Sequence, residues 1–461
     1  MHEGLDEPIP GGSRWAYVFG SGLLFIFINQ IVTGICLALY YVPSVEHAHT
    51  TVAFIQKEVW AGRFIRGLHS YGSSLMIVLL LLHLAQTFLY GAYKNRRELL
   101  WLMGCFLFLL VFGMSFTGYL LPWDRRAYFA TAVGTNIISE VPFVGNFLKT
   151  ALRGGVEMGT LTLSHFYVLH VFVVPALIFG AVAAHVFLFR RAGAAGPPLR
   201  KDDRRELPTE FFYPRQVVKD FVFGILLIIA VGALAFFWPV LLGPVANPSD
   251  STYVPRPEWY YLPAFQWLKY WRKGGLVLGI VVIPLLLFGA LIGLPFLDRS
   301  PRRRPSERPV FVLGFLLVFA GIVFLGFQSN LEDRRDPAVR AKLQAQEKGE
   351  EEYNNAPFRP HEEGTAALTG PAAGAASLSP EQSKGALLFE SESCSACHGA
   401  GGRGGNGLTE LSRIGGRFTD AQLTSLLRKP LPKMIEGGMQ PSELKDPDLV
   451  ALVAYLRATL K

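Results

Sequence analysis

Seven long apolar runs constrain the fold of this 461-residue chain more than any other feature. A helix needs about 20 mostly apolar residues to cross a bilayer. The runs lie at about residues 16–42, 69–93, 99–121, 163–189, 217–242, 275–297 and 309–328. The sequence therefore predicts a mainly α-helical protein with seven transmembrane helices. Because the first run is too long for a cleavable signal peptide, we expect its helix to act as its own insertion signal.

The distribution of basic residues predicts the orientation in the membrane. The formal net charge is +8, and lysine and arginine gather near residues 94–97, 190–205 and 299–308. With seven consecutive spans, these three loops fall on one side, which the positive-inside rule identifies as the cytoplasm. We expect a multi-pass protein of the bacterial inner membrane, with its C-terminus on the outer, periplasmic side. No basic patch interleaved with aromatic residues indicates a nucleic-acid partner.

Two histidine pairs lie inside these apolar runs. His69 and His83 are spaced i, i+14, and His170 and His185 are spaced i, i+15. In a helix, an i, i+14 interval advances about 21 Å and returns a side chain to within about 40° of the same face. Two such helices could hold two non-covalent hemes b at two depths, each iron between one imidazole from each helix. The alternative is four histidines hydrogen-bonded to neighbours, but ionisable residues inside membranes are rare and usually functional.

Two glycine pairs repeat the i, i+14 spacing of the first histidine pair. Gly20 and Gly34 lie in the first run, and Gly104 and Gly118 lie in the third. A missing side chain at each heme level would let a flat macrocycle approach the backbone. The alternative is simple helix packing, for which glycine is common in membranes.

Three charged residues stand near the predicted membrane boundaries. Arg66 precedes His69 by about one helical turn, so it could pair with a heme propionate. An interfacial arginine that reaches toward water is an equal alternative. Lys219 and Asp220 stand at the inner mouth of the fifth helix. By themselves, such residues are ordinarily an interfacial anchor.

An acidic residue lies in the outer loop between the fifth and sixth runs. Glu258 is flanked by Pro257, Trp259 and Tyr260. Apolar surroundings should raise the pKa of this carboxyl, so that it could accept a proton near neutrality. The alternative is an ordinary solvated loop acid.

The C-terminal quarter of the chain has a different composition. Residues 331–378, rich in Glu, Gln, Ala, Gly and Pro, predict a flexible tether. A helix start follows, with Ser379 as N-cap, Pro380 at the first helical position and Gln382 at the third. Further helices near 420–428 and 447–460 would complete a small all-α domain over residues 379–461.

This domain contains a Cys-x-x-Cys-His motif, formed by Cys394, Cys397 and His398. The motif is typical of covalent c-type heme attachment, with the two cysteines bound to the vinyl groups and His398 bound to iron. A redox or zinc Cys-x-x-Cys is the alternative. Met439 is the predicted sixth ligand, which would raise the reduction potential, and Met434 is its competitor.

With these motifs in place, residues 14–328 resemble the cytochrome b core of the cytochrome bc complexes, and the tail resembles a class I cytochrome c. The histidine pattern, the paired glycines, TGYLLPWD at 117–124 and PEWY at 257–260 carry the resemblance. The i, i+15 spacing of the second histidine pair and the absence of an eighth span resemble the split form of chloroplasts, here fused into one chain. The implied domains are a four-helix heme b domain (1–195), a three-helix quinol-site domain (196–330), the tether (331–378) and the cytochrome c domain (379–461).

The resemblance also implies roles for particular residues. His69 and His170 would bind the outer heme b, and His83 and His185 the inner one. Arg66 matches a propionate-binding arginine. The outer quinol pocket would include Gly134, Pro257, Glu258, Trp259 and Tyr260, with Glu258 and Tyr260 catalytic, and the inner quinone site would include Lys219 and Asp220. Ile26 stands where the chloroplast type has a heme-binding cysteine, so no such extra heme is predicted.

The implied protein is the cytochrome b/c fusion subunit of a proton-translocating quinol:cytochrome c oxidoreductase. It would pass one quinol electron to a Rieske iron–sulfur partner and the other through the two hemes b to an inner quinone. The heme c would take the Rieske electron onward to a c-type cytochrome, an oxidase or a reaction centre. By analogy, the complex would be homodimeric. The alternatives are a non-translocating heme conduit, which needs no outer pocket, and a cytochrome c domain that senses or docks.

Overall fold

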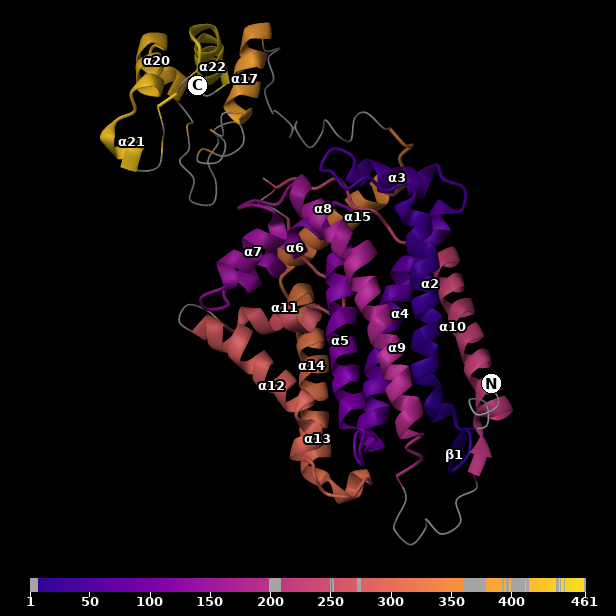
Figure 1. Cartoon of the computed structure of the whole chain (residues 1–461). Coiled ribbons are helices and arrows are strands. Elements are labelled where there is room, and N and C mark those ends of the chain that lie inside the picture. The colour runs from indigo at the N-terminus through magenta and orange to yellow at the C-terminus, as the bar shows by residue number, and fades with distance from the viewer. Residues whose placement is uncertain are drawn as a thin grey trace. The chain divides into compact units, whose positions relative to one another are not determined.

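The computed structural model describes residues 7–198, 209–248, 250, 253–271, 275–359, 379–391, 394, 398, 411, 414–436, 439, 441–442 and 444–459. The chain divides into a first unit that extends to about residue 368 and a second unit from about 369 to 461. Both consist mainly of helices (Figure 1).

Four long helices form the centre of the first unit (Figure 1). They are α2 (Val18–Ala38), α4 (Gly62–Leu89), α5 (Glu98–Tyr119) and α9 (Val174–Ala192), the last continuing α8 (Thr160–Val168) through a π turn at Leu169–Val173. Helix α2 packs on α4, and α5 packs on α9. Helices α2 and α4 approach closely at Gly72 of α4, where an added Cβ would lie 2.2 Å from Gln30 Oε1 of α2.

Three further apolar segments flank this centre. Helix α10 (Val217–Phe237) packs on α2 and α4. A π turn at Leu278–Val282, α12 (Ile283–Ile292) and α13 (Leu294–Leu297) follow α11 (Leu262–Lys269), and the chain returns through α14 (Pro309–Arg335). Among the described residues, six helices are long and apolar enough to span a membrane, and Leu278–Ile292 is shorter. The sixth predicted span is therefore a broken helix, although α12 and α13 still run beside α14 toward the opposite end (Figure 1).

The three basic loops meet at one end of the bundle, as predicted. Lys94 Nζ donates a hydrogen bond to Asp298 Oδ1 at 2.6 Å. The Arg303 guanidinium donates to the carbonyl oxygens of Ala195 (2.6 Å) and Gly196 (2.7 Å). We call this the inner end, following the predicted orientation. A short antiparallel ribbon of β1 (Pro8–Pro10) and β2 (Thr209–Phe211) also lies in this unit.

Short helices cover the other end, which we call the outer end. They are α3 (Ala48–Lys57), α6 (Arg125–Ser139) and α7 (Gly145–Arg153). Asp124 begins α6, because its Oδ1 accepts the Ala127 N–H at 2.8 Å. Its Oδ2 accepts the Gly243 N–H at 3.1 Å. One carboxylate thus joins the segment before α6 to the loop that follows α10.

The prediction of a flexible tether over residues 331–378 is wrong for its first half. Helix α14 continues to Arg335, and α15 occupies Pro337–Asn355. Asp336 caps α15 by accepting the N–H groups of Ala338 (2.9 Å) and Val339 (3.2 Å). The polar residues that suggested a tether are mostly good helix formers, and side chains of α15 bond to the outer loops. Residues 360–378 of the predicted tether lie outside the described residues.

The second unit is a small helical domain. It contains α17 (Pro380–Ser391), α19 (Ile414–Arg417), α20 (Asp420–Arg428), α21 (Pro432–Glu436) and α22 (Asp446–Thr459), so both predicted later helices are confirmed. The predicted start of α17 is also confirmed, since the Gln382 N–H donates to Ser379 Oγ at 3.3 Å and the Ser379 N–H to Gln382 Oε1 at 2.9 Å. Helix α17 crosses α22 closely, because a Cβ on Gly385 would lie 2.0 Å from Ala451 O.

Candidate functional site

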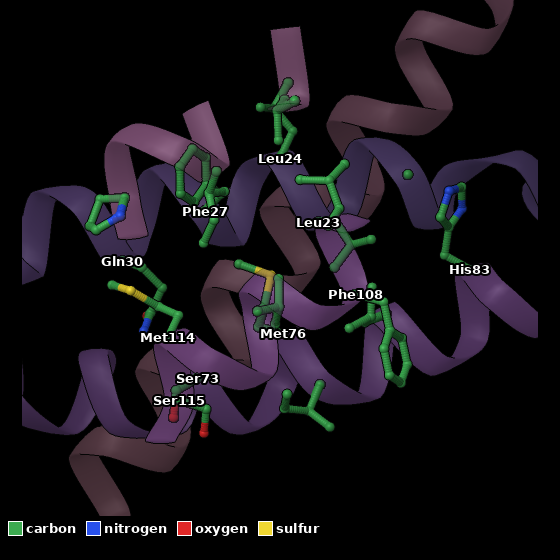
Figure 2. A pocket seen from close by; sticks show the side chains of 18 of the residues that line it. Leu23, Leu24, Phe27, Gln30, Ser73, Met76, His83, Phe108, Met114 and Ser115 are labelled. Atoms are coloured by element: carbon green, nitrogen blue, oxygen red, sulfur yellow. The ribbon is translucent and has the colours of Figure 1, made fainter. Parts of the chain in front are cut away.

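A cavity of about 1390 Å³ lies inside the first unit. Its lining includes all four predicted membrane histidines. At the outer end it reaches Arg126, Glu258 and Glu350, and at the inner end Arg97 and Asp220. Apolar side chains from α2, α4 and α5 line its middle; Figure 2 shows Leu23, Phe27, Met76, Phe108 and Met114 among them, with His83 at one side.

The histidines form two pairs between α4 and the span that contains the π turn and α9. The ring centroids of His69 and His170 are 6.2 Å apart, and those of His83 and His185 are 6.5 Å apart. Two metal–nitrogen bonds of about 2.0 Å would separate two imidazole centroids by roughly 6 Å. Each pair therefore has the spacing that a single metal atom between two rings requires. The pairing is the one that the spacing predicts.

Hydrogen bonds at Nδ1 determine which ring nitrogen of two of these histidines could bind a metal. His170 Nδ1 lies 3.1 Å from the Met114 carbonyl oxygen, which can only accept, so Nδ1 carries the proton. His69 Nδ1 lies 2.9 Å from Thr33 Oγ1, whose own hydrogen is donated to Asn29 O at 2.6 Å. Both rings therefore keep an unprotonated Nε2 for a metal. Such outer partners fix the tautomer of metal-binding histidines.

Each predicted glycine faces one histidine ring. A Cβ would lie 3.3 Å from His83 Cε1 at Gly20, 3.2 Å from His69 Cε1 at Gly34, 3.4 Å from His185 Cε1 at Gly104 and 2.3 Å from His170 Cε1 at Gly118. Helix α2 thus makes room at the α4 histidines, and α5 makes room at His170 in the π turn and at His185 on α9. The glycine pairs, the two ring pairs and the cavity fit two flat groups, each bound by two imidazoles.

The π turn explains why the histidines of α4 are spaced i, i+14 and the other two i, i+15. The Val174 N–H bonds to Leu169 O, five residues back, and Pro175 supplies no N–H. A π turn of this kind contains one residue more than the α-helical turn it replaces. The longer interval from His170 to His185 therefore advances nearly as far as the shorter one from His69 to His83, and both pairs stay in register.

The outer end of the cavity holds the predicted acid. Glu258 lines it together with Tyr119, Asp124, Arg126 and Tyr260. Burial raises the pKa of the Glu258 carboxyl, in the predicted direction; the Arg126 charge lowers it, and the Asp124 charge adds to the increase. The arrangement can hold a proton-accepting carboxylate beside an apolar cavity.

Of the other residues of the predicted outer site, only Tyr260 also lines the cavity. Tyr260 lines the cavity, and its hydroxyl accepts a hydrogen bond from Ser115 Oγ at 2.6 Å. Among the described residues that line the cavity, Gly134, Pro257 and Trp259 do not occur. Gly134 lies on α6, where a Cβ would be 2.6 Å from a Phe116 ring atom. Close packing against Phe116 thus explains why residue 134 is a glycine.

The two predicted inner-site residues point to different places. Asp220 lines the cavity and accepts a hydrogen bond from Gln216 Nε2 at 2.9 Å. Lys219 Nζ donates instead to the Ser13 carbonyl at 2.9 Å and to Ser13 Oγ at 2.7 Å. Adjacent residues on a helix diverge by about 100°, so they do not share a face. Only Asp220 and Gln216 of these residues are candidates for contact with a ligand in the cavity.

Arg66 lines the cavity beside His69, and its guanidinium already has partners. It donates to Gln56 Oε1 at 2.7 Å and to Val240 O at 2.8 Å. These bonds hold the positive charge at the outer histidine level. The predicted contact between Arg66 and a heme propionate stays a prediction.

Two charged residues at the outer end were missed in the sequence. Arg126 follows the TGYLLPWD segment by two positions, so a signal was present there. Glu350 lies in the polar stretch that was interpreted as a tether. The two form an ion pair, with Arg126 Nη2 2.8 Å from Glu350 Oε2.

The second unit contains part of the predicted heme c site. Cys394 packs against the core around Phe389 and Leu452, and His398 and Met439 are partly buried. Cys397 lies outside the described residues. Met439 N–H donates to Met434 O at 2.9 Å, so both candidate sulfur ligands belong to one short segment.

Substituting leucine for each methionine should distinguish them. Met439→Leu should lower the reduction potential of the c-type heme by on the order of 0.1 V, because a thioether ligand stabilises ferrous iron. Met434→Leu, the matched control, should leave it nearly unchanged. Potentiometric titration of the α-band measures both, and the opposite result would make Met434 the ligand.

The chain is similar in sequence to known protein families and to several known proteins. Family models described as "Cytochrome b/b6/petB", "Cytochrome b(C-terminal)/b6/petD" and "Cytochrome c" match residues 5–193, 245–342 and 382–460. A cytochrome bc complex cytochrome b subunit of Chlorobaculum thiosulfatiphilum is 38% identical over 67% of this chain and 72% of its own. A menaquinol:cytochrome c reductase cytochrome b subunit of Geobacillus thermodenitrificans is 44% identical over 40% of this chain and 83% of its own.

A solved structure shares the fold. A chain of "Hyperthermophilic respiratory Complex III" superposes with a TM-score of 0.61 at 24% identity, over 76% of this chain and 94% of that one. At that identity, the likeness concerns the fold alone.

Proposed function

Because the chain belongs to the cytochrome b family of the bc-type complexes and ends in a cytochrome c domain, we propose that it is the cytochrome b/c subunit of a quinol:cytochrome c oxidoreductase. The observation that carries the proposal is the cavity, which combines two histidine pairs with a carboxylate at each end, Glu258 at the outer end and Asp220 at the inner end. A simple electron conduit needs the histidines but not the outer acid.

The outer end would oxidise quinol. Apolar walls would hold the quinol ring, and the Glu258 carboxylate would accept the proton of a quinol hydroxyl. Arg126 favours the ionised form of Glu258, while burial of the site favours the neutral form. Glu258 would thus bind a proton during oxidation and release it to the outer side. Tyr260 would line the pocket, held by Ser115.

The inner end would reduce quinone. Asp220, held by Gln216, would supply protons there. His69 with His170 and His83 with His185 would hold two hemes b, which carry electrons across the membrane when bound. In the second unit, His398 and Met439 would hold the iron of a heme c attached to Cys394 and Cys397.

An external partner completes the proposal. The first electron acceptor would be a separate Rieske iron–sulfur protein, because the chain resembles one subunit of a cytochrome bc complex. The quinol would come from the membrane pool; the relative from Geobacillus thermodenitrificans is named for menaquinol. We propose a homodimeric complex in the bacterial inner membrane, with the cytochrome c domain on the periplasmic side.

Glu258→Gln tests the outer site. In the purified complex, quinol-dependent reduction of heme c should fall about 100-fold, because the amide cannot accept a proton. In the wild type, the rate should rise as the pH increases through the raised pKa of Glu258, since the base must be ionised. We call this rise the acidic limb of the pH profile, and it should be absent in the variant. Glu46→Gln, an exposed outer-loop acid, serves as the control. Undiminished heme c reduction in Glu258→Gln would favour the conduit.

A further inference from the structure

Helix α15 carries a polar stripe that contacts the outer loops. Gln346, Glu350 and Asn354 follow one another at four-residue spacing, so they share one face. Gln346 forms two hydrogen bonds with the backbone of Val254: Oε1 accepts its N–H at 3.0 Å, and Nε2 donates to its carbonyl at 3.3 Å. Asn354 does the same with Leu242, at 3.1 and 2.7 Å. The stripe therefore holds both ends of the segment that leads to the PEWY loop.

Glu350 stands between these two anchors and faces the cavity. It lines the outer end, its side chain is 10% exposed, and it accepts a hydrogen bond from Arg126 Nη2 at 2.8 Å. Arg126 also acts electrostatically on Glu258. A buried carboxylate is costly unless it is paired, so this contact joins α15 to the charge cluster of the pocket.

Other contacts hold α15 in the same place. Lys57 Nζ donates to the Tyr353 carbonyl at 2.8 Å, and the Tyr353 ring lies 5.4 Å from the His49 ring. Just beyond the helix, Phe358 packs against Phe54 at 5.6 Å. Lys57, His49 and Phe54 all belong to α3, so contacts with α3 hold α15 in addition to the contact of Glu350 with Arg126.

We propose, on the basis of the function proposed above, that α15 forms part of the outer quinol pocket and that Glu350 is a positioning residue for Glu258, acting through Arg126. Glu350 neutralises part of the guanidinium charge that stabilises ionised Glu258. The titratable and charged groups that interact electrostatically with Glu258 are Tyr119, Asp124, Arg126 and Tyr260, and those that interact with Glu350 are Asp124, Arg126, Tyr253 and Glu347.

The direction of the effect follows from these charges. Removing the negative charge in Glu350→Gln leaves Arg126 uncompensated, which lowers the pKa of Glu258. Since quinol oxidation needs ionised Glu258, the acidic limb of the rate should move to lower pH, by about one unit. Arg126→Gln should move the limb in the opposite direction. Glu350→Asp keeps the charge and should restore the wild-type limb to within about 0.3 unit.

The experiment measures the pH profile of quinol-dependent heme c reduction in the whole purified complex. The ratio of heme b to heme c verifies that each variant is folded. Glu351→Gln, an exposed neighbour on α15, is the matched control and should leave the limb in place. Opposite shifts for Glu350→Gln and Arg126→Gln, with rescue by Glu350→Asp, support the proposal.

Two results would overturn it. One is a folded Glu350→Gln variant whose acidic limb lies at the same pH as that of the wild type. The other is a Glu351→Gln variant whose acidic limb moves as far as that of Glu350→Gln, which would indicate a general surface-charge effect. Either result leaves the proposed function intact if Glu258→Gln is inactive. An active Glu258→Gln would instead refute the proposed function itself.

Discussion

Replacing His170 or His185 by leucine should remove one of the two non-covalent hemes and leave the other bound. Each ring is one half of a pair, with centroids 6.2 or 6.5 Å apart, and leucine offers no nitrogen to iron. The ratio of heme b to heme c in the purified protein should fall from about 2:1 to about 1:1. Quinol-dependent electron transfer to the inner quinone should be lost in both variants.

The matched control lies on the same span. His165 is exposed and bonds through Nδ1 to the carbonyl of Ala151 at 3.1 Å, so His165→Leu should keep both hemes. Pyridine hemochrome spectra separate b-type from covalently attached c-type heme. A ratio that stays near 2:1 in His170→Leu and His185→Leu would refute the ligand assignment.

The second large effect concerns the π turn. Deleting Gly180, in the regular part of α9, should rotate His185 by about 100° relative to His170. One heme should then be lost. Deleting Phe172 from the π turn, together with Pro175→Ala, should be tolerated, because a regular helix with its histidines at i and i+14 has the same register as α4. Phe172 is 60% exposed, so its loss creates no cavity.

The same heme measurement decides this prediction. The Phe172 deletion with Pro175→Ala should retain about two hemes b per heme c, and the Gly180 deletion about one. The two deletions are equal in length and lie on one helix, so a general effect of shortening cannot explain a difference. Loss of heme in both would show that the π turn does more than correct the register.

The membrane histidines and glycines could be predicted because helical geometry is local. An i, i+14 interval returns to nearly the same face whatever surrounds it. The same reasoning could not place Lys219, because its partner Ser13 lies 206 positions away in the sequence, whereas Asp220 bonds locally to Gln216, four residues before it. Here a motif carried over from a family predicted a pair that the fold separates.

The helix α15 shows where reasoning from composition failed. Asp336 and Pro337 form the same kind of helix start as Ser379 and Pro380, which was recognised. The acidic, glutamine-rich sequence after Asp336 outweighed that signal. Glu350 could not be paired with Arg126 from the sequence, since 224 positions separate them. Long-range charge pairs of this kind depend on tertiary packing.

The helix after the last span also limits how far from the first unit the cytochrome c domain can begin. Phe358 packs on Phe54, so the membrane unit holds the chain almost to Arg359. The roughly 20 residues from there to Ser379 can extend to at most roughly 70 Å, whereas a leash starting at residue 331 could reach roughly 170 Å. The volume that the first residue of the cytochrome c domain can reach is thus more than tenfold smaller than with the longer connection. Under the proposed function, a carrier confined in this way would meet the acceptor of its own protomer far more often than that of a distant complex.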